Sequence, residues 1–204
     1  MTTATAASQP STKPSLRWRV VDIVVAAVVA VACAVVFVGW NFGSHIFDGL
    51  QAVLPGIQSL GYGPWLLGGP LVALIIRKPG AALFGELVAA AVSMLLGAPW
   101  GLQTLESGLV QGLAVEIVFA AFLYRAWSWP IALLAGAAAG LVAGLNDWLF
   151  YYAGADSLFL TIYIVGATIS GAVIAGLGSW ALVKALARTG ALRRFAAGRE
   201  AERV

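Results

Sequence analysis

The chain has 204 residues, of which 61% are hydrophobic and only 10% are charged, and its formal net charge at pH 7 is +3. Soluble globular domains have roughly half apolar and a quarter charged residues, so this composition excludes an ordinary soluble domain and predicts a polytopic membrane protein. The net charge requires no nucleic-acid partner, because attraction of basic residues to anionic membrane lipid explains it.

Six apolar segments approach or reach the roughly 17 to 25 residues that a helix needs to cross a bilayer. They cover residues 19–40, 62–77, 80–96, 104–123, 129–152 and 158–186. We therefore predict an all-α polytopic membrane protein, with six transmembrane helices in residues 17–188. Residues 1–16, rich in Ala, Ser, Thr and Pro, predict a disordered N-terminal tail, and residues 189–204 a basic C-terminal tail.

The basic residues alternate with the six segments. All 12 Lys and Arg lie at or before the start of the first segment, at the connection of the second to the third or of the fourth to the fifth, or at or beyond the end of the sixth. The connections on the opposite side contain no Lys or Arg and carry His45 and acidic residues. By the positive-inside rule, both termini and both tails are predicted to be cytoplasmic.

Small residues recur at intervals of four in two segments. The first segment contains Ala26, Ala30 and Ala34, and the fifth contains Gly136, Gly140 and Gly144. Such stripes let helix backbones approach closely. In the fifth segment the pattern favours packing within the helix bundle. In the first, packing within the bundle and docking to another membrane subunit both remain open.

Three carboxylates, Glu86, Glu116 and Asp147, lie inside apolar segments that contain no Lys or Arg near them. An ionisable group at bilayer depth is costly, so it usually faces the bundle interior and has a function. At about 1.5 Å per residue, Glu86 lies towards the inner interface, Glu116 near mid-membrane and Asp147 near the outer interface. We interpret the three as a cavity that receives a cation from outside, with Glu116 in the leading role. Asp147 alone is also compatible with an ordinary interfacial acid, and Glu86 with a protonated helix–helix contact.

Polar and aromatic neighbours extend this candidate site. Gln111 precedes Glu116 on the same segment, and Tyr151 lies one helical turn beyond Asp147. Carboxylates accept paired hydrogen bonds from amino-substituted rings, and indole faces attract cationic rings. The predicted ligand is therefore flat, positively charged and rich in nitrogen, although an interfacial aromatic belt explains many of the rings equally well. The predicted substrate-binding residues are Glu116, Glu86, Asp147, Gln111, Trp40, Asn41, Trp100 and Tyr151.

Several classes of protein lose support because their motifs are missing. The sequence has no GxxxxGK[ST] loop, so it predicts no ATP hydrolysis by that route. His45 is the single histidine and Cys33 the single cysteine, so neither a zinc site nor a nucleophile–base pair can be assembled from them. We predict neither an enzyme nor a protein with a metal or another cofactor.

Three blocks of the sequence resemble the YkoE-type substrate-binding (S) components of energy-coupling-factor (ECF) transporters. The first is IRKPGAAL at residues 76–83, followed by Glu86, and the second is GLVQGL at residues 108–113, followed by Glu116. The third is DWLF at residues 147–150, and the likeness extends from about residue 17 to residue 186.

The resemblance implies six helices in a bacterial plasma membrane that bind thiamine or its hydroxymethylpyrimidine (HMP) precursor from outside. It also implies a membrane T subunit and cytoplasmic ATPase subunits, which energise uptake. In such S components a small-residue stripe on the first helix docks to the T subunit, and Ala26, Ala30 and Ala34 match it. Ala114 and Asn146 depart from the family pattern, in which a glycine and an aromatic residue are expected.

Two other functions remain open from the residues alone. In a proton-coupled secondary transporter of a small cationic heterocycle, Glu116 would titrate during the transport cycle. In a structural or assembly protein without a ligand, the three acids would be protonated hydrogen-bond partners between helices. Transport that depends on ATPase subunits would argue against the secondary transporter. Measurable ligand binding would argue against the structural protein.

Overall fold

A computed structural model describes residues 16–201, and this part of the chain is helical, with no β-strand. The first helix, α1 (Val20–Gly43), continues into the 3₁₀ segment η1 (Ser44–Ala52). Two further 3₁₀ segments, η2 (Ile57–Gly61) and η3 (Gly63–Leu66), lead into α2 (Gly68–Ile76). Every residue of α2 is buried, which makes this short helix the centre of the bundle.

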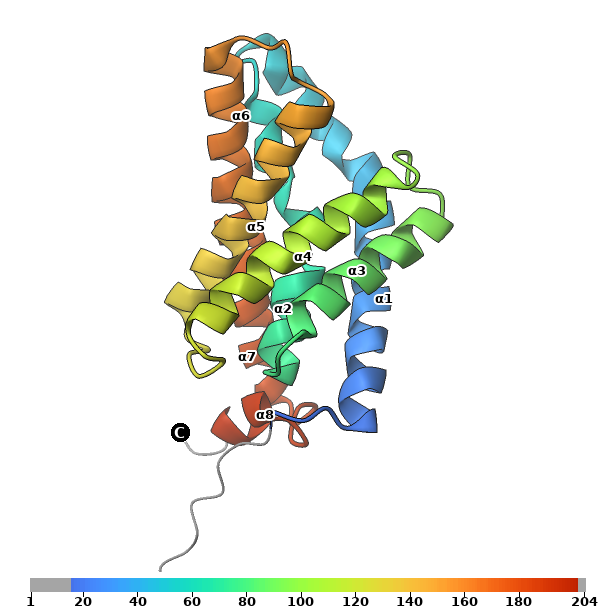
Figure 1. The fold of residues 1–204 in the computed structure, drawn as a ribbon, viewed down its shortest axis with the longest axis vertical. Helices are drawn as coiled ribbons and strands as arrows, with labels where there is room; N and C mark the ends of the chain where they lie inside the picture. Colours follow the sequence, from blue (N-terminus) through green and yellow to red (C-terminus); the bar gives the residue numbers. More distant parts are fainter. Residues whose placement is uncertain (1–15, 202–204) are drawn as a thin grey trace, which may run out of the picture.

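The remaining helices surround α2. They are α3 (Ala81–Leu95), α4 (Gln103–Ala121), α5 (Trp129–Phe150) and α6 (Ser157–Ser170). The last one extends without a break through a π-helical segment, η4 (Gly171–Gly178), into α7 (Ser179–Arg188), and a short α8 (Ala196–Ala201) follows. Figure 1 shows an elongated molecule in which α3 and α4 cross in front of α2.

All six predicted apolar segments coincide with helical rods of the structure, which confirms the all-α prediction. Four rods are long and apolar enough to cross a membrane: Val20–Ala52, Gln103–Ala121, Trp129–Phe150 and Ser157–Arg188. The other two, Gly63–Ile76 and Ala81–Leu95, are shorter apolar helices. A crossing of the membrane by all six segments is therefore a proposal.

The glycine stripe of α5 packs within the chain, as predicted. A Cβ atom added at Gly136 would lie 2.2 Å from the carbonyl oxygen of Gly171, and one at Gly140 would lie 2.2 Å from that of Ala167. Both distances are far below van der Waals contact, so only glycine allows α5 to approach the rod of α6 and η4 this closely.

The alanine stripe of α1 is also directed inward, which differs from its predicted role in docking a partner. Ala26, Ala30 and Ala34 are at most 1% exposed, and α1 packs against α2 and α3. The exposed face of α1 consists of β-branched residues such as Val24 and Val28 instead. The small side chains therefore serve close packing inside this chain, and they are not available to a partner in this structure.

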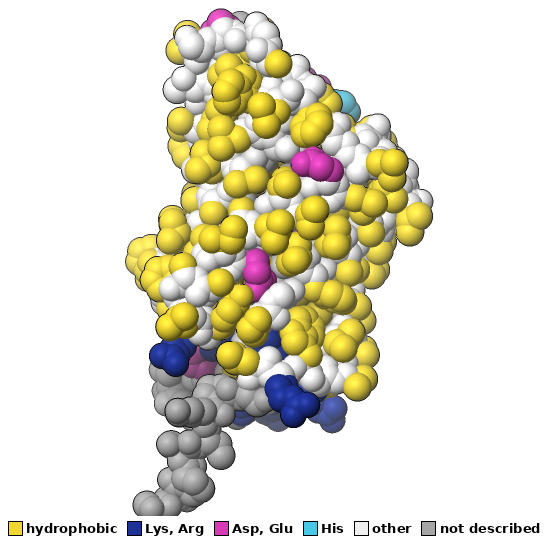
Figure 2. Space-filling view, viewed as in Figure 1, with side chains coloured by type: hydrophobic (Ala, Val, Ile, Leu, Met, Phe, Trp, Pro, Cys, Tyr) yellow, Lys and Arg dark blue, Asp and Glu magenta, His cyan; other side chains and the backbone are white. Residues whose placement is uncertain are grey.

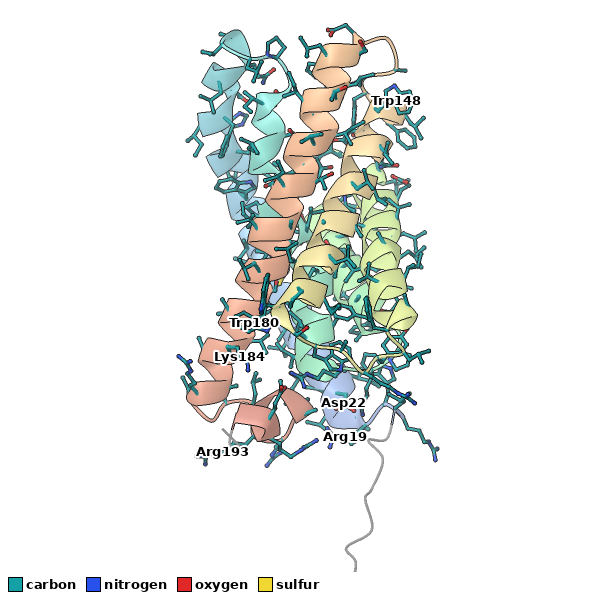
Figure 3. All side chains as sticks on the ribbon, turned by 90° about the vertical axis from the view of Figure 1, so that its left-hand side faces the viewer. Arg19, Asp22, Trp148, Trp180, Lys184 and Arg193 are labelled. Carbon is teal, nitrogen blue, oxygen red and sulfur yellow. The ribbon has the colours of Figure 1, made fainter. Side chains whose placement is uncertain are left out.

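One end of the molecule, which we call the basic end, collects Lys and Arg side chains (Figure 2). Both described chain ends lie there, and Arg19, Lys184 and Arg193 lie there while Trp148 lies towards the opposite end (Figures 1 and 3). The predicted sorting of charge to one side is thus a property of the fold. Most of the predicted N-terminal tail lies outside the described residues.

The predicted C-terminal tail packs back onto the basic end as far as it is described. Leu192, Phe195 and Ala197 are buried, and α8 packs against α2 and α7. The chain reverses direction at Gly190, whose φ of +81° favours glycine. Three apolar residues among the charges make this segment part of the domain, where its basic composition had predicted a separate tail.

Candidate substrate-binding site

A cavity of about 550 Å³ lies towards the end of the molecule opposite the basic end. Its wall combines α3, α4 and α5 with α6 and the three 3₁₀ segments that follow α1. Three acidic residues, Asp48, Glu86 and Asp147, line it, whereas none of its lining residues within the described chain is Lys, Arg or His. Asp48 pairs with His45, which lies outside the wall, at 2.9 Å, whereas Glu86 and Asp147 have no basic partner among the described residues.

Glu86 is brought to the cavity wall by α3 and is 1% exposed. Its carboxylate accepts a hydrogen bond of 2.6 Å from the backbone N–H of Gly69, in the first turn of α2. N–H groups in the first turn of a helix have no intrahelical acceptor, so they are ready to bind an anionic group. A Cβ atom at Gly112 would lie 3.0 Å from that of Glu86, so glycine in the GLVQGL block lets α4 pass close to this acid.

Asp147 enters the cavity from the last turns of α5. Its carboxylate accepts hydrogen bonds from the hydroxyl groups of Tyr163 (2.7 Å) and Tyr62 (3.3 Å). Both donors are uncharged, so they orient the carboxylate without neutralising it. Asp147 therefore resembles Glu86 in having neutral donors and no basic partner among the described residues.

Aromatic rings form a continuous wall beside these acids. Tyr62 and Trp65 meet edge to face at 5.8 Å between ring centroids, and Trp65 and Trp100 meet in the same way at 5.6 Å. The indole N–H of Trp65 donates to the side-chain oxygen of Asn41 at 2.9 Å. Trp100 is 42% exposed, so one indole remains accessible at the cavity wall.

Polar atoms without partners also face this region. The side-chain oxygens of Gln58 and Thr104 are buried and have no hydrogen-bond partner in the structure, and both residues line the cavity. Buried polar groups are normally hydrogen-bonded. Gln111, Ser93 and Ser107 line the same space. A ligand with several donors and acceptors would satisfy such a wall.

Five of the eight predicted substrate-binding residues line the cavity. These are Glu86, Asp147, Gln111, Trp100 and Tyr151. Tyr151 also donates its hydroxyl hydrogen to the side-chain oxygen of Gln103 at 2.8 Å. The structure thus brings together Glu86 of α3, Gln111 of α4 and Asp147 of α5, and the first and last of these are 61 positions apart in the sequence.

Glu116 lies away from this cavity, although we predicted it as the leading ligand-binding residue. Its carboxylate accepts hydrogen bonds from the backbone N–H groups of Gly80 (2.6 Å) and Ala82 (2.9 Å) at the start of α3. It also accepts one from the hydroxyl of Tyr124 at 2.7 Å. The N-terminus of α3 satisfies this charge, because its free N–H groups and its dipole favour an anion. The position of Glu116 therefore supports a role in holding helices together.

Trp40 and Asn41 are likewise outside the cavity wall. The indole N–H of Trp40 donates to the carbonyl oxygen of Gly61 at 2.7 Å, which fastens α1 to η2. Asn41 accepts a hydrogen bond from the indole of Trp65, so it contacts a residue of the cavity wall but does not line the cavity itself. Both act on the 3₁₀ segments that form the cavity wall.

Several lining residues were not predicted from the sequence. Tyr62 and Tyr163 belong to the aromatic-rich outer end of the helices, but nothing local marks them as donors to Asp147. Trp65, Gln58 and Thr104 lie in or beside irregular segments. In such segments helical periodicity cannot predict which side chains face the interior. The signal that could have indicated them is the concentration of polar and aromatic residues around the second and fourth apolar segments.

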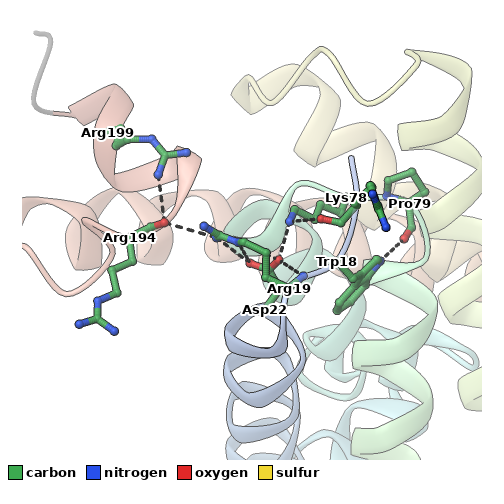
Figure 4. Close-up of polar contacts among 8 residues, drawn as sticks. Trp18, Arg19, Asp22, Lys78, Pro79, Arg194 and Arg199 are labelled. Carbon is green, nitrogen blue, oxygen red and sulfur yellow. Dashed lines mark hydrogen bonds and ion pairs between the residues drawn. The ribbon is translucent and has the colours of Figure 1, made fainter. Parts of the chain in front are cut away.

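A second polar cluster occupies the basic end (Figure 4). Asp22, which is fully buried, pairs with Arg19 at 2.8 Å and with the ammonium group of Lys78. Lys78 also donates to the carbonyl oxygen of Arg17 at 2.5 Å, and the indole of Trp18 donates to that of Pro79 at 2.8 Å. The RKPG turn between α2 and α3 is therefore clamped to the beginning of α1. Asp22 was not predicted as a functional residue, because in the sequence it follows the basic residues of the N-terminal region directly.

Comparison with known proteins places this arrangement among membrane transport components. A family model described as "ABC-type cobalt transport system, permease component" matches residues 21–142. An HMP/thiamine permease protein of Bacillus subtilis (strain 168), YkoE, is 37% identical over 184 residues, which are 90% of this chain and 92% of the relative. The crystal structure of an S-component of an ECF transporter superposes with a TM-score of 0.82 at 36% identity, covering 92% of this chain and 94% of the other. Among the described residues, no group of three or more His, Cys, Asp or Glu side chains is placed to hold a metal ion.

Proposed function

The chain belongs to the YkoE-type S components of ECF transporters, and from this premise we propose that its cavity captures thiamine or HMP from outside the cell. The protein is a multi-pass protein of the bacterial plasma membrane and the substrate-binding subunit of an importer, not an enzyme. The observation that carries the proposal is the pair of cavity acids, Glu86 and Asp147, whose partners are neutral donors only.

The size and chemistry of the cavity suit such a ligand. Small-molecule sites usually enclose roughly 300–1,000 Å³, and this cavity measures about 550 Å³. One carboxylate can accept hydrogen bonds from the exocyclic amino group of the pyrimidine, which thiamine and HMP share. The other can offset the positive thiazolium charge of thiamine, and an indole such as Trp100 attracts the cationic ring.

The proposal includes the orientation of the chain in the membrane. All six apolar helices would cross or enter the bilayer, with both termini and the basic end on the cytoplasmic side and the cavity towards the outside. Segregation of Lys and Arg at one end supports this orientation through the positive-inside rule. The buried position of α2 supports a span that is shorter than the bilayer, because neighbouring helices cover it on all sides.

The proposed importer requires partners that supply energy. The sequence contains no GxxxxGK[ST] phosphate loop. We therefore expect a membrane T subunit and cytoplasmic ATPase subunits to assemble with this chain and to drive release of the ligand. Uptake by the chain alone under a pH gradient would instead indicate a secondary transporter.

Calorimetry on the detergent-purified protein tests the ligand. Thiamine, HMP and the isolated thiazole half are titrated separately. We expect thiamine and HMP to bind with a stoichiometry of one, and the thiazole half to bind at least about tenfold more weakly, because it lacks the amino-substituted ring. Absence of binding by both thiamine and HMP would reject the proposal, and tighter binding of the thiazole half would reassign the two carboxylates.

A further inference from the structure

A second recess, of about 780 Å³, opens at the basic end and shares no lining residue with the substrate cavity. It lies where the beginning of α1, the turn between α2 and α3, the connection between α4 and α5, and α8 meet. Nothing in the proposed capture of thiamine or HMP uses it. We call it the basic recess.

The wall of the basic recess has a large excess of positive charge. No Asp or Glu is among its lining residues in the described part of the chain, and its six basic ones are Arg17, Arg19, Arg77, Lys78, Arg125 and Arg199. They come from four separate segments of the chain. Figure 4 shows Arg19 and Lys78 at Asp22, and Arg19 and Arg199 at the carbonyl oxygen of Arg194. Converging charges of one sign raise the local concentration of the opposite ion.

Nearby carboxylates compensate only part of this charge. Asp22 pairs with Arg19 and Lys78, and Glu200 pairs with Arg77 at 2.7 Å. Glu116 is adjacent through Tyr124 but is already bound by backbone N–H groups of α3. Arg125 forms no ion pair with a carboxylate of the described residues. Among the described residues, Asp22 and Glu200 pair with three of the six basic residues and supply two negative charges, so the wall keeps an excess of positive charge.

Two helices end at the basic recess. Within the described chain, the non-glycine residues with positive φ are Arg77 (+56°), Leu123 (+53°) and Tyr124 (+56°). All three line the basic recess. Arg77 ends α2, and Leu123 and Tyr124 follow the end of α4, where left-handed residues commonly terminate helices. These two helix ends bring Arg77 and the connection that carries Arg125 to the wall of the basic recess.

Apolar side chains share the same wall. Leu16 and Leu123 are 47% and 63% exposed, and Trp127 and Phe195 lie beside the basic residues. The guanidinium group of Arg77 lies 5.7 Å from the ring centroid of Trp127. A ligand that complements this surface has an anionic head and an adjoining hydrocarbon part. A small inorganic ion would use only the basic side.

We propose that the basic recess binds a phosphate ester, supplied by the headgroup of an anionic phospholipid in the inner leaflet. Guanidinium groups match phosphate oxygens in two-point hydrogen bonds, and basic residues near the inner leaflet attract anionic lipid. The inference rests on the membrane orientation proposed above but not on the identity of the transported ligand. A soluble phosphate ester has the same head chemistry, and the experiment separates the two sources.

The test is a thermal-shift titration of the full chain in neutral detergent. The probes are phosphatidylglycerol, phosphatidylcholine as the zwitterionic lipid, and glycerol 3-phosphate, all at constant ionic strength. Phosphatidylglycerol should stabilise the protein saturably, and phosphatidylcholine should not. The double variant Arg125→Gln/Arg199→Gln should bind phosphatidylglycerol about tenfold more weakly, because two basic residues near the anionic lipid are lost.

The matched control removes the same charge from α7, outside the basic recess. Lys184→Gln/Arg188→Gln should bind phosphatidylglycerol within about twofold of the unmodified protein, because neither residue lines the recess. Saturable stabilisation by glycerol 3-phosphate with the same variant dependence would support the phosphate site and identify a soluble ligand. Equal losses in both double variants, or equal effects of both lipids, would overturn the site. Thiamine binding, measured in the same samples, reports separately on the transport proposal.

Discussion

Buried or half-buried carboxylates occur at both ends of this molecule, but their partners differ. At the basic end, Asp22 pairs with Arg19 and Lys78, and Glu116 binds the N-terminus of α3. In the substrate cavity, Glu86 and Asp147 accept hydrogen bonds only from a backbone N–H and from tyrosine hydroxyls. Asp22 therefore has its counter-charge inside the chain. Glu116 has neutral donors only, as Glu86 and Asp147 do, but it lies outside the cavity and accepts from three of them at 2.6–2.9 Å.

This difference separates structural acids from ligand-binding acids better than depth in the membrane does. A carboxylate whose charge is satisfied within the protein stabilises the fold, and its loss should be measured in unfolding experiments. A carboxylate in a cavity without a basic partner leaves the counter-charge to a ligand, and its loss should be measured in affinity. Substitution of acids of both kinds, and of the aromatic wall beside the cavity acids, tests this difference.

The largest effect is expected at the basic end, from Asp22→Ala. This change leaves the ammonium group of Lys78 without its carboxylate in a site where Lys78 is only 8% exposed. Removing one partner of a buried ion pair usually costs about 3–5 kcal/mol. We expect a matching decrease in the free energy of unfolding in detergent, while the fraction that remains folded binds thiamine with unchanged affinity.

A double variant controls for the loss of charge itself. Asp22→Ala/Lys78→Met removes both members of the pair, and replacing both charges by apolar groups is often close to neutral. Most of the lost stability should therefore return. If the double variant is as unstable as Asp22→Ala, the pair is not the source of the effect, and packing around Asp22 is.

Replacing Glu86 and Glu116 separately by glutamine gives the sharpest test of this difference between the acids. Glu86→Gln keeps an acceptor for the N–H of Gly69 but removes the negative charge from the cavity. We expect thiamine affinity to fall by about ten- to a hundredfold, the usual range for a hydrogen bond to a charged group, with little change in unfolding. The measurement is calorimetric titration, with thermal unfolding of the same sample.

Glu116→Gln is the matched control and should behave in the opposite way. Its amide nitrogen cannot accept from the N–H groups of Gly80 and Ala82, so at least one donor loses its partner. The expected cost in unfolding free energy is about 1–2 kcal/mol, with thiamine affinity within about twofold. A large loss of affinity in Glu116→Gln and none in Glu86→Gln would restore our sequence-based assignment and refute the structural one.

Much of the fold could be predicted from the sequence, because long apolar runs must become helices in a bilayer. The short span 62–77 was less predictable, because it divides into η3 and α2 at Leu67, directly before Gly68, Gly69 and Pro70. The small-residue stripes of α1 and α5 show a second limit of prediction from the sequence. A spacing of four reveals a close-packed face in α1 and α5, but the partner of that face is a property of the tertiary fold.

The candidate site was predicted in part, for a related reason. Glu86 and Asp147 stand out as acids in apolar segments, and the structure places both in the cavity wall. Glu116 has the same local pattern, yet its partners at residues 80 and 82 are more than thirty positions away. Periodicity and depth cannot indicate that the N-terminus of another helix supplies the compensating dipole.

The smallest expected effect concerns the aromatic wall, through Trp100→Leu. If the cavity supplies counter-charge with ring faces as well as with carboxylates, this change should weaken the cationic thiamine more than the neutral HMP. An exposed cation–π contact contributes about 0.5–1 kcal/mol, so we expect thiamine affinity to fall two- to fivefold by calorimetry, with a smaller change for HMP. Unfolding should change little, because the side chain is 42% exposed. Equal losses for both ligands would show that Trp100 contributes apolar contact alone, and the two carboxylates would then account for the whole preference of the cavity for a cation.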